Sequence, residues 1–143
     1  MARDACATIE TVRDTIWQKG QRPPAWMEQL VDDVCRDAGV LWMRPELTTT
    51  KVECDTTFGG RWFAYRNGIG VILHPQKTIN YGVTVHECGH FLRWAFGGDE
   101  PGEHDEAYYE LMEKLYPHWG VSFDTAMTIE HAPPRRWREK RLW

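Results

Sequence analysis

Apolar residues recur at helical spacing between Pro24 and Gly39. One stripe repeats every three or four positions and comprises Met27, Leu30, Val31, Val34, Cys35 and Ala38. Pro24 suits the first turn of a helix, where its missing N–H costs nothing, and Gly39 is a natural C-terminal stop. A shorter repeat upstream comprises Ile9, Val12 and Ile16. The pattern therefore predicts two amphipathic N-terminal helices that pack into a core, the first within residues 4–18.

Residues 47–54 lose this spacing and are rich in β-branched side chains, which is typical of a strand. Two further β-prone runs, residues 61–66 and 69–75, flank Asn67 and Gly68. An Asn-Gly pair between two such runs is the strongest short-range signal of a hairpin, because both turn residues must tolerate positive φ. The sequence therefore predicts a small antiparallel sheet of about three strands with a hairpin at Asn67-Gly68.

Helical spacing returns in residues 80–96 and in residues 104–116. The later segment is amphipathic, with Ala107, Leu111 and Leu115 on one line and Tyr108, Met112 and Tyr116 beside it. We expect Pro117 to end this helix, and periodicity is weak beyond it. These features predict an α+β fold, organised as a single domain over residues 1–132 and an extended basic tail over residues 133–143.

Composition narrows the class of protein. Apolar residues make up 42% and charged residues 27% of the 143 positions, as in ordinary globular proteins. No apolar run approaches the roughly 18 residues that cross a membrane, and none follows the first residues as in a signal peptide. We therefore expect a cytoplasmic protein with no membrane partner. The cysteines form no C-x-x-C pair, so we expect small buried side chains at Cys6, Cys35, Cys54 and Cys88.

Charge is unevenly distributed along the chain. The net charge is -4, yet residues 135–143 carry five Lys and Arg against one Glu, which leaves 12 basic and 20 acidic side chains in the first 134 residues. With Trp137 and Trp143, this tail is a candidate anchor for a protein partner, since Arg and Trp are common at interfaces. Binding of nucleic acid by the same residues is the weaker interpretation. Residues 99–113 hold seven acidic and no basic residues, which predicts an acidic rim that attracts basic substrates or the protein's own tail.

The motif that carries chemistry is H-E-x-x-H, at His86, Glu87 and His90. Residues four apart lie on one face of a helix, so both imidazoles can bind one zinc ion with the Glu87 carboxylate beside them. A catalytic zinc usually takes three protein ligands and leaves a fourth position to water. The motif therefore predicts a zinc site that needs one more ligand.

The third ligand does not follow from the motif alone. A metzincin would have a Gly and a His three and six residues after the second histidine, where this chain has Arg93 and Phe96. That leaves His104 at the start of the next helix, and Glu106 or Glu110 within it. We favour His104, and Glu110 is the main alternative, because a helical glutamate at longer spacing is the gluzincin arrangement.

Other residues near the motif have weaker assignments. We expect ordinary polar roles for His74, His118 and His131. Tyr108 is expected to be a packing aromatic, and Tyr65 or Tyr109 is a candidate to stabilise the oxyanion of a tetrahedral intermediate.

Three segments, in this order, resemble the SprT-like zinc metallopeptidases: residues 60–75, residues 85–90 and residues 102–108. In that family a β-hairpin precedes H-E-x-x-H, and a third histidine ligand follows. The resemblance covers roughly residues 47–116. The chain departs from the family pattern in having Asp105 where Gly is common.

The resemblance implies a minimal zincin fold, Zn²⁺ bound by His86, His90 and His104, and hydrolysis of peptide bonds. No cysteine follows Cys88, so we do not expect the C-terminal zinc ribbon of longer members or their link to DNA. The chain is more similar to short stand-alone members from phages and actinobacteria. For a phage-encoded protein, the expected location is the host cytoplasm or the virion.

These predictions combine into a hydrolase that acts on a protein or peptide substrate. Glu87 would be the general base that accepts a proton from a metal-activated water. The strand that ends at Leu73 would pair with an extended substrate by strand addition. The alternative is a structural or interaction protein, such as a component of a phage particle, whose zinc only stabilises the fold.

Overall fold

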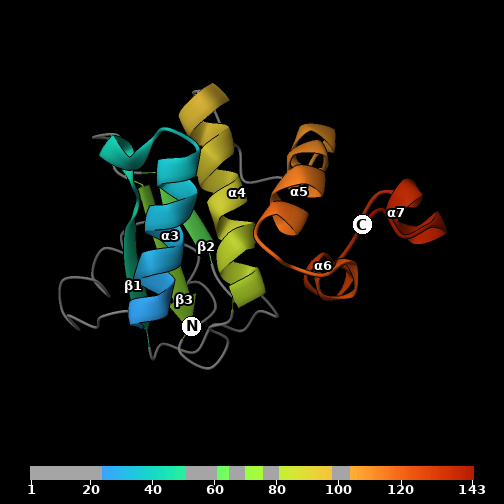
Figure 1. Ribbon diagram of the computed structural model, residues 1–143, viewed down its shortest axis with the longest axis horizontal. Helices are drawn as coiled ribbons and strands as arrows, with labels where there is room; N and C mark the ends of the chain where they lie inside the picture. The colour runs from blue at the N-terminus through green and yellow to red at the C-terminus, as the bar shows by residue number, and fades with distance from the viewer. Residues whose placement is uncertain (1–23, 51–60, 65–69, 76–80, 98–103) are drawn as a thin grey trace, which may run out of the picture. The chain divides into compact units, whose positions relative to one another are not determined.

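The computed structural model describes residues 24–50, 61–64, 70–75, 81–97 and 104–143, with only the backbone for residues 48–50, 61–64 and 70–75 (Figure 1). The chain divides into two compact units, Met1–Asn80 and Tyr81–Trp143. Five α-helices and three short strands make the described part mostly helical. The expected first helix, the turn at Asn67-Gly68 and Tyr65 lie outside the described residues. The prediction of one domain over residues 1–132 stays a prediction.

Helix α3 (Ala25–Asp37) in the first unit confirms the predicted second helix. Its buried residues are five of the six in the predicted stripe, namely Met27, Leu30, Val31, Val34 and Cys35. Gly39 adopts φ 77°, which allows the Val40 N–H to bond the Cys35 carbonyl at 2.8 Å. Burial raises the pKa of the Cys35 thiol to about 11. Pattern and capping residues were therefore sufficient to predict this helix.

Strands β1 (Glu46–Thr50), β2 (Arg61–Ala64) and β3 (Gly70–Pro75) form a sheet in the order β1-β3-β2. β2 and β3 pair antiparallel, as the hairpin prediction requires. β1 pairs with β3 in parallel, so the prediction of a wholly antiparallel sheet is wrong. The error arose because β1 does not pair with its neighbour in sequence, and sequence gives no direct signal of pairing between distant strands.

Strand β3 is the central strand of this sheet. Leu73 lies opposite Thr48 of β1 on one side and Arg61 of β2 on the other. The backbone of β3 is therefore paired with a neighbouring strand on both sides. The predicted substrate edge at Leu73 is wrong, because a strand that is already paired twice cannot add a third strand.

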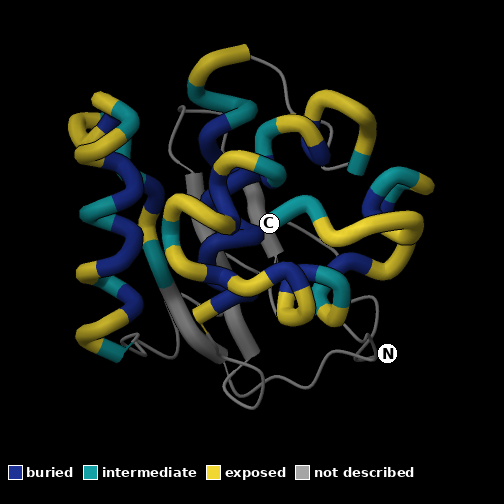
Figure 2. Tube along the Cα trace, turned by 45° about the vertical axis from the view of Figure 1, so that its right-hand side comes forward, coloured by how far each residue is buried: buried dark blue, intermediate teal, exposed yellow. Residues whose placement is uncertain are grey.

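Helix α4 (Tyr81–Gly97) opens the second unit and carries the H-E-x-x-H motif, as predicted. It is buried continuously from Gly82 to Leu92 (Figure 2) and contacts helices α5 (Glu106–His118) and α6 (Phe123–Ile129). A Cβ on Gly89 would stand 2.3 Å from Met112 Sδ of α5. The glycine inside the motif therefore permits the close approach of the two helices. None of the described helices combines the length and apolarity that a membrane span requires.

Helix α5 buries all of one predicted line, Tyr108, Met112 and Tyr116, and only Leu115 of the other. Ala107 is exposed, and the buried residues are Tyr108, Tyr109, Met112, Leu115 and Tyr116. Pro117 lies inside the helix, whose last turn still closes through the Trp119 N–H to the Leu115 carbonyl at 3.0 Å. The prediction that Pro117 ends the helix is therefore wrong by one residue.

The C-terminal region forms two helices that the sequence pattern did not predict (Figure 1). Ser122 caps α6 by accepting the Thr125 N–H at 3.1 Å. Helix α7 (Arg135–Glu139) follows, and Trp137 within it is 1% exposed. The prediction of an extended tail is therefore wrong, because burial of a large aromatic ring holds this short segment in a helix.

Candidate metal centre

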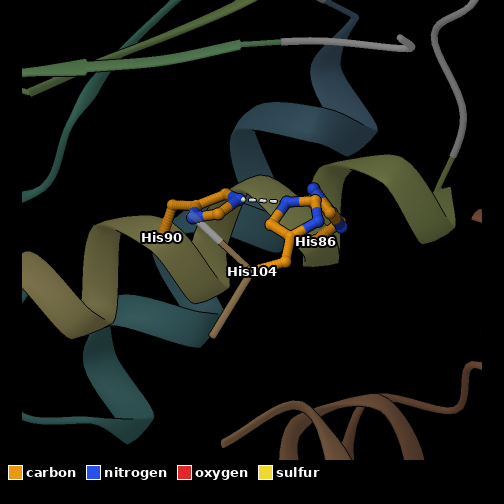
Figure 3. Close-up of side chains that lie close together, drawn as sticks. All are labelled: His86, His90 and His104. Carbon is orange, nitrogen blue, oxygen red and sulfur yellow. Dashed lines mark hydrogen bonds between the residues drawn. The ribbon is translucent and has the colours of Figure 1, made fainter. Parts of the chain in front are cut away.

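Three histidines of the second unit come together around one point (Figure 3). His86 and His90 lie one turn apart on α4, and His104 lies two residues before α5. One ligand nitrogen from each lies within 4.8 Å of the others, and the Nε2 atoms of His90 and His104 are 3.2 Å apart. Nitrogens about 2 Å from a tetrahedral zinc ion are separated by roughly 3.3 Å. This donor set could therefore hold a metal ion. Imidazole nitrogens suit zinc, and the pair formed by His90 and His104 already has the separation that zinc requires.

The competing third ligands lie elsewhere. Glu110 and Glu106 are both exposed on α5 and are not members of this cluster. Glu106 instead pairs with Arg136 of α7, with Oε1 2.6 Å from a guanidinium nitrogen. The prediction that these residues bind zinc stays untested, but His104 is the candidate that the fold brings to the two motif histidines.

Asp105 follows His104 directly in the chain and fixes the start of α5. Its carboxylate caps α5 by accepting the Tyr108 N–H at 2.9 Å. The same carboxylate pairs with the Arg93 guanidinium of α4 at 3.0 and 3.1 Å. The Tyr108 N–H and the Arg93 charge lower the pKa of the Asp105 carboxyl group. Asp105 therefore ties the start of α5 to α4, next to the third histidine of the cluster.

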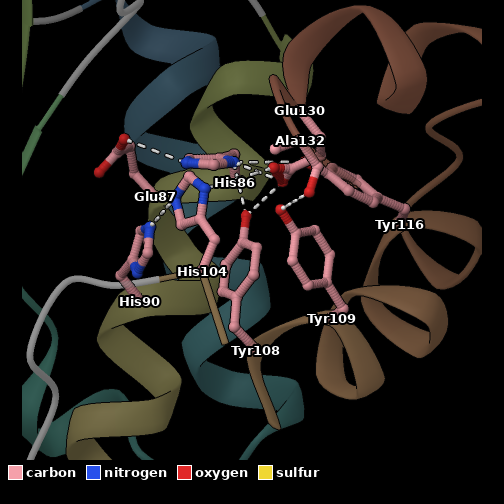
Figure 4. Close-up of polar contacts among 9 residues, drawn as sticks. All are labelled: His86, Glu87, His90, His104, Tyr108, Tyr109, Tyr116, Glu130 and Ala132. Carbon is pink, nitrogen blue, oxygen red and sulfur yellow. Dashed lines mark hydrogen bonds and ion pairs between the residues drawn. The ribbon is translucent and has the colours of Figure 1, made fainter. Parts of the chain in front are cut away.

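Glu87 places a carboxylate at the same centre (Figure 4). The residue is 4% exposed, and Oε1 lies 3.8 Å from His86 Nε2. Its other oxygen, Oε2, is buried without a hydrogen-bond partner among the described residues. Such a group costs free energy unless a ligand, ion or water satisfies it.

Glu130 is the residue of this centre that the sequence did not reveal. It follows α6 directly and is 3% exposed. Its Oε1 lies 2.9 Å from His86 Nδ1 and accepts the hydroxyls of Tyr108 at 2.5 Å and Tyr116 at 3.0 Å (Figure 4). No motif or spacing marks a carboxylate that lies 44 positions beyond its partner. Only the folding of α6 against α4 brings the two together.

The protonation of these groups follows from their surroundings. Burial would lower the pKa of His86, but its hydrogen bond to Glu130 and the nearby carboxylates raise it overall. Burial and the neighbouring His86 lower the pKa of His104 to about 4, so this imidazole is neutral at pH 7. Burial opposes ionisation of Glu130, yet bonds from His86 and Tyr108 lower its pKa. Burial and Glu130 raise the pKa of Tyr108 well above its usual range, so its hydroxyl keeps its proton.

The tyrosines nearby have separate roles. The Tyr108 ring stacks against His90 and His104, with centroids 4.8 and 4.6 Å away, which supports its predicted packing role. The Tyr109 hydroxyl donates to the Ala132 carbonyl at 3.1 Å, and burial raises its pKa to about 12. An oxyanion role for Tyr109 stays a prediction. His118 and His131 are exposed and outside the cluster.

The C-terminal helix covers part of the acidic segment. Arg136 contacts Glu113 at 2.5 Å as well as Glu106, and the Trp137 indole N–H donates to Glu113 at 2.6 Å. The acidic segment was expected to attract basic substrates or the protein's own tail. Among the described residues, it is the tail that contacts this segment. Arg141 and Trp143 likewise bond Asp124 and the Val121 carbonyl. Binding of an external partner by this tail stays a prediction.

Comparison of the chain with protein families, with curated protein sequences and with solved structures finds no match.

Proposed function

We propose that this chain is a zinc-dependent peptidase of the SprT-like, minimal zincin type. The observation that carries the proposal is the place of Glu87. Its buried carboxylate lies beside the Nε2 atom of His86, and one of its oxygens has no hydrogen-bond partner among the described residues. A purely structural zinc site has no use for such a group, whereas hydrolysis needs a base at this position.

Each residue of the centre has a role in this reaction. His86, His90 and His104 would hold the zinc ion. When bound, zinc lowers the pKa of a coordinated water toward about 7 and polarises the scissile carbonyl. Glu87 accepts the proton of the attacking water and passes it to the leaving amine. His104, with 27% of its side chain exposed against 9% for His86, marks the side that a substrate can reach.

The Glu87→Gln variant tests this function, because it keeps the shape of the side chain and removes the base. We expect unchanged zinc content and a loss of hydrolysis of about 100-fold to 10,000-fold on quenched fluorescent peptides. Glu110→Gln is the matched control, since Glu110 is an exposed residue of α5 outside the cluster. A Glu87→Gln protein that binds zinc and cleaves at the wild-type rate would overturn the proposal.

A structural zinc site is the second candidate, and the depth of the cluster favours it. His86 and His90 are only 7% and 4% exposed, and structural zinc sites are closed to solvent. In that case the wild-type protein cleaves no peptide in the same assay, while removal of zinc by a chelator lowers the midpoint of urea unfolding. A wild-type protein that cleaves peptides would exclude this candidate.

A further inference from the structure

The Nδ1 atom of His86 lies between two groups that compete for it. Glu130 Oε1 is 2.9 Å from this nitrogen, the Tyr108 hydroxyl oxygen is 2.6 Å from it, and the two competitors are 2.5 Å from each other. The three atoms form a closed triangle on one side of the imidazole ring (Figure 4). The other ring nitrogen, Nε2, faces Glu87. In a neutral imidazole, the group that determines whether Nδ1 carries the proton therefore also determines whether Nε2 carries it.

When His86 is neutral, as it must be to bind a metal ion, two arrangements of protons satisfy this triangle. A neutral imidazole carries one proton, on either Nδ1 or Nε2. In the first arrangement Nδ1 carries the proton and donates it to Glu130, and Tyr108 also donates to Glu130. In the second, Tyr108 donates to a bare Nδ1 and the proton resides on Nε2. Only the first leaves a lone pair on Nε2 for a metal ion.

The charge on Glu130 selects the first arrangement. An ionised carboxylate has no proton to give and accepts several strong hydrogen bonds at once. It accepts the hydrogen bond of the Tyr108 hydroxyl, and the Tyr116 hydroxyl donates to the same oxygen at 3.0 Å. Tyr116 lies 3.4 Å from Nδ1, so it is the weaker competitor for this nitrogen.

We propose that Glu130 is a positioning residue that fixes His86 as the Nδ1–H tautomer, because it accepts the Tyr108 hydrogen bond that would otherwise go to Nδ1. This role makes His86 ready to bind metal before the metal arrives. Its consequence for zinc rests on the proposed function above, whereas the tautomer itself is a property of the metal-free protein.

The test removes the acceptor and then the competing donor. Glu130→Leu leaves the Tyr108 hydroxyl free to donate to Nδ1, so the proton moves to Nε2 and zinc affinity falls by roughly 10-fold to 100-fold, as for other partners of metal ligands. Adding Tyr108→Phe in the E130L background deletes the competing hydroxyl and keeps the ring, so affinity recovers by several-fold. A general structural role predicts the opposite, because a second buried substitution would weaken binding further.

Two measurements read the outcome. Zinc affinity is measured at neutral pH by competition with a chromophoric chelator, and the His86 tautomer is read from long-range ¹⁵N–¹H NMR spectra of the metal-free protein. At a pH high enough to keep His86 neutral, above its raised pKa, we expect Nδ1–H in the wild type and Nε2–H in E130L. Glu113→Leu is the control for Glu130→Leu, since Glu113 also accepts two side-chain hydrogen bonds, but from Trp137 and Arg136, in a partly buried position outside the histidine cluster. Only the Glu130 substitution should lower zinc affinity.

The possible results separate this proposal from the proposed function. A wild type without zinc affinity overturns the proposed function, and the NMR spectra of the metal-free proteins still decide the role of Glu130. If the wild type and E130L show the same His86 tautomer, or if E130L/Y108F binds zinc more weakly than E130L, the role of Glu130 is overturned. If circular dichroism shows that E130L does not fold, Glu130→Gln and its Tyr108→Phe double variant replace it, with a smaller expected loss and the same recovery.

Discussion

The second unit contains two clusters of opposite polarity, one of polar side chains and one of aromatic rings. The histidine cluster joins three imidazoles with Tyr108 and the carboxylates of Glu87 and Glu130. The aromatic cluster packs the Trp137 ring against other aromatic rings at centroid distances of 5.3 to 6.4 Å, namely Tyr109, Tyr116, Phe123 and Trp143. The first cluster holds polar groups that cost free energy to bury. The second holds apolar rings whose burial stabilises the fold.

Tyr116 belongs to both clusters. Its hydroxyl donates to Glu130, and its ring stacks on Trp143 with centroids 6.1 Å apart. The segment after α5 therefore supplies the histidine cluster with a carboxylate and the aromatic cluster with most of its rings. Residues 119–143, where the sequence shows little periodicity, therefore support the candidate site: Glu130 bonds His86 directly, and the tail packs behind it through Trp137 and Trp143.

Removal of the central ring of the aromatic cluster should have the largest effect. Trp137→Ala deletes a side chain that is 1% exposed, so we expect the free energy of unfolding to fall by about 3–5 kcal/mol in urea titrations. Trp42→Ala, at a residue that is 83% exposed, should change it by less than about 0.5 kcal/mol. A loss below about 1 kcal/mol for Trp137→Ala would show that the aromatic cluster is not what stabilises this unit.

Two glycines of α4 provide a second test. Gly89 lies in the buried middle of the helix against α5, and Gly97 is the exposed last residue of the helix. Gly89→Ala would press against Met112, which costs about 1–3 kcal/mol, partly offset by the better helix propensity of alanine. Gly97→Ala meets nothing within 4 Å and should be neutral or stabilising by up to about 1 kcal/mol. Thermal unfolding of the two variants measures whether each substitution stabilises or destabilises the protein. Equal effects would mean that the contact of α4 with α5 is not tight at Gly89.

Two helix caps provide the smallest and most selective test. Asp105→Ala and Ser122→Ala each remove a cap, of α5 and α6 respectively, and each should cost about 1 kcal/mol of stability. Only Asp105→Ala should also lower zinc affinity, because its carboxylate ties the segment beside His104 to Arg93. Equal zinc affinity in the two variants would show that His104 needs no such support.

Local patterns predicted the elements whose signals lie close together in sequence. The apolar stripe of α3 and its stop at Gly39 were sufficient for that helix, and the Asn-Gly signal was sufficient for the pairing of β2 with β3. The same logic failed for β1, whose partner is distant in sequence. It also failed for α7, because a five-residue helix has too few turns to show a period and forms through tertiary packing.

In the candidate site too, local spacing predicted some residues and tertiary packing placed the others. The spacing of the motif was enough to predict that His86 and His90 share one face of a helix with Glu87 beside them, because helical geometry fixes that relation locally. Only the tertiary structure decided that His104 joins them while Glu110 stays exposed, because the direction in which α5 returns to α4 depends on packing at Gly89 and on the pair of Asp105 with Arg93. Glu130 was likewise decided by the fold, since a buried carboxylate finds its partners in space and no spacing along the chain encodes them.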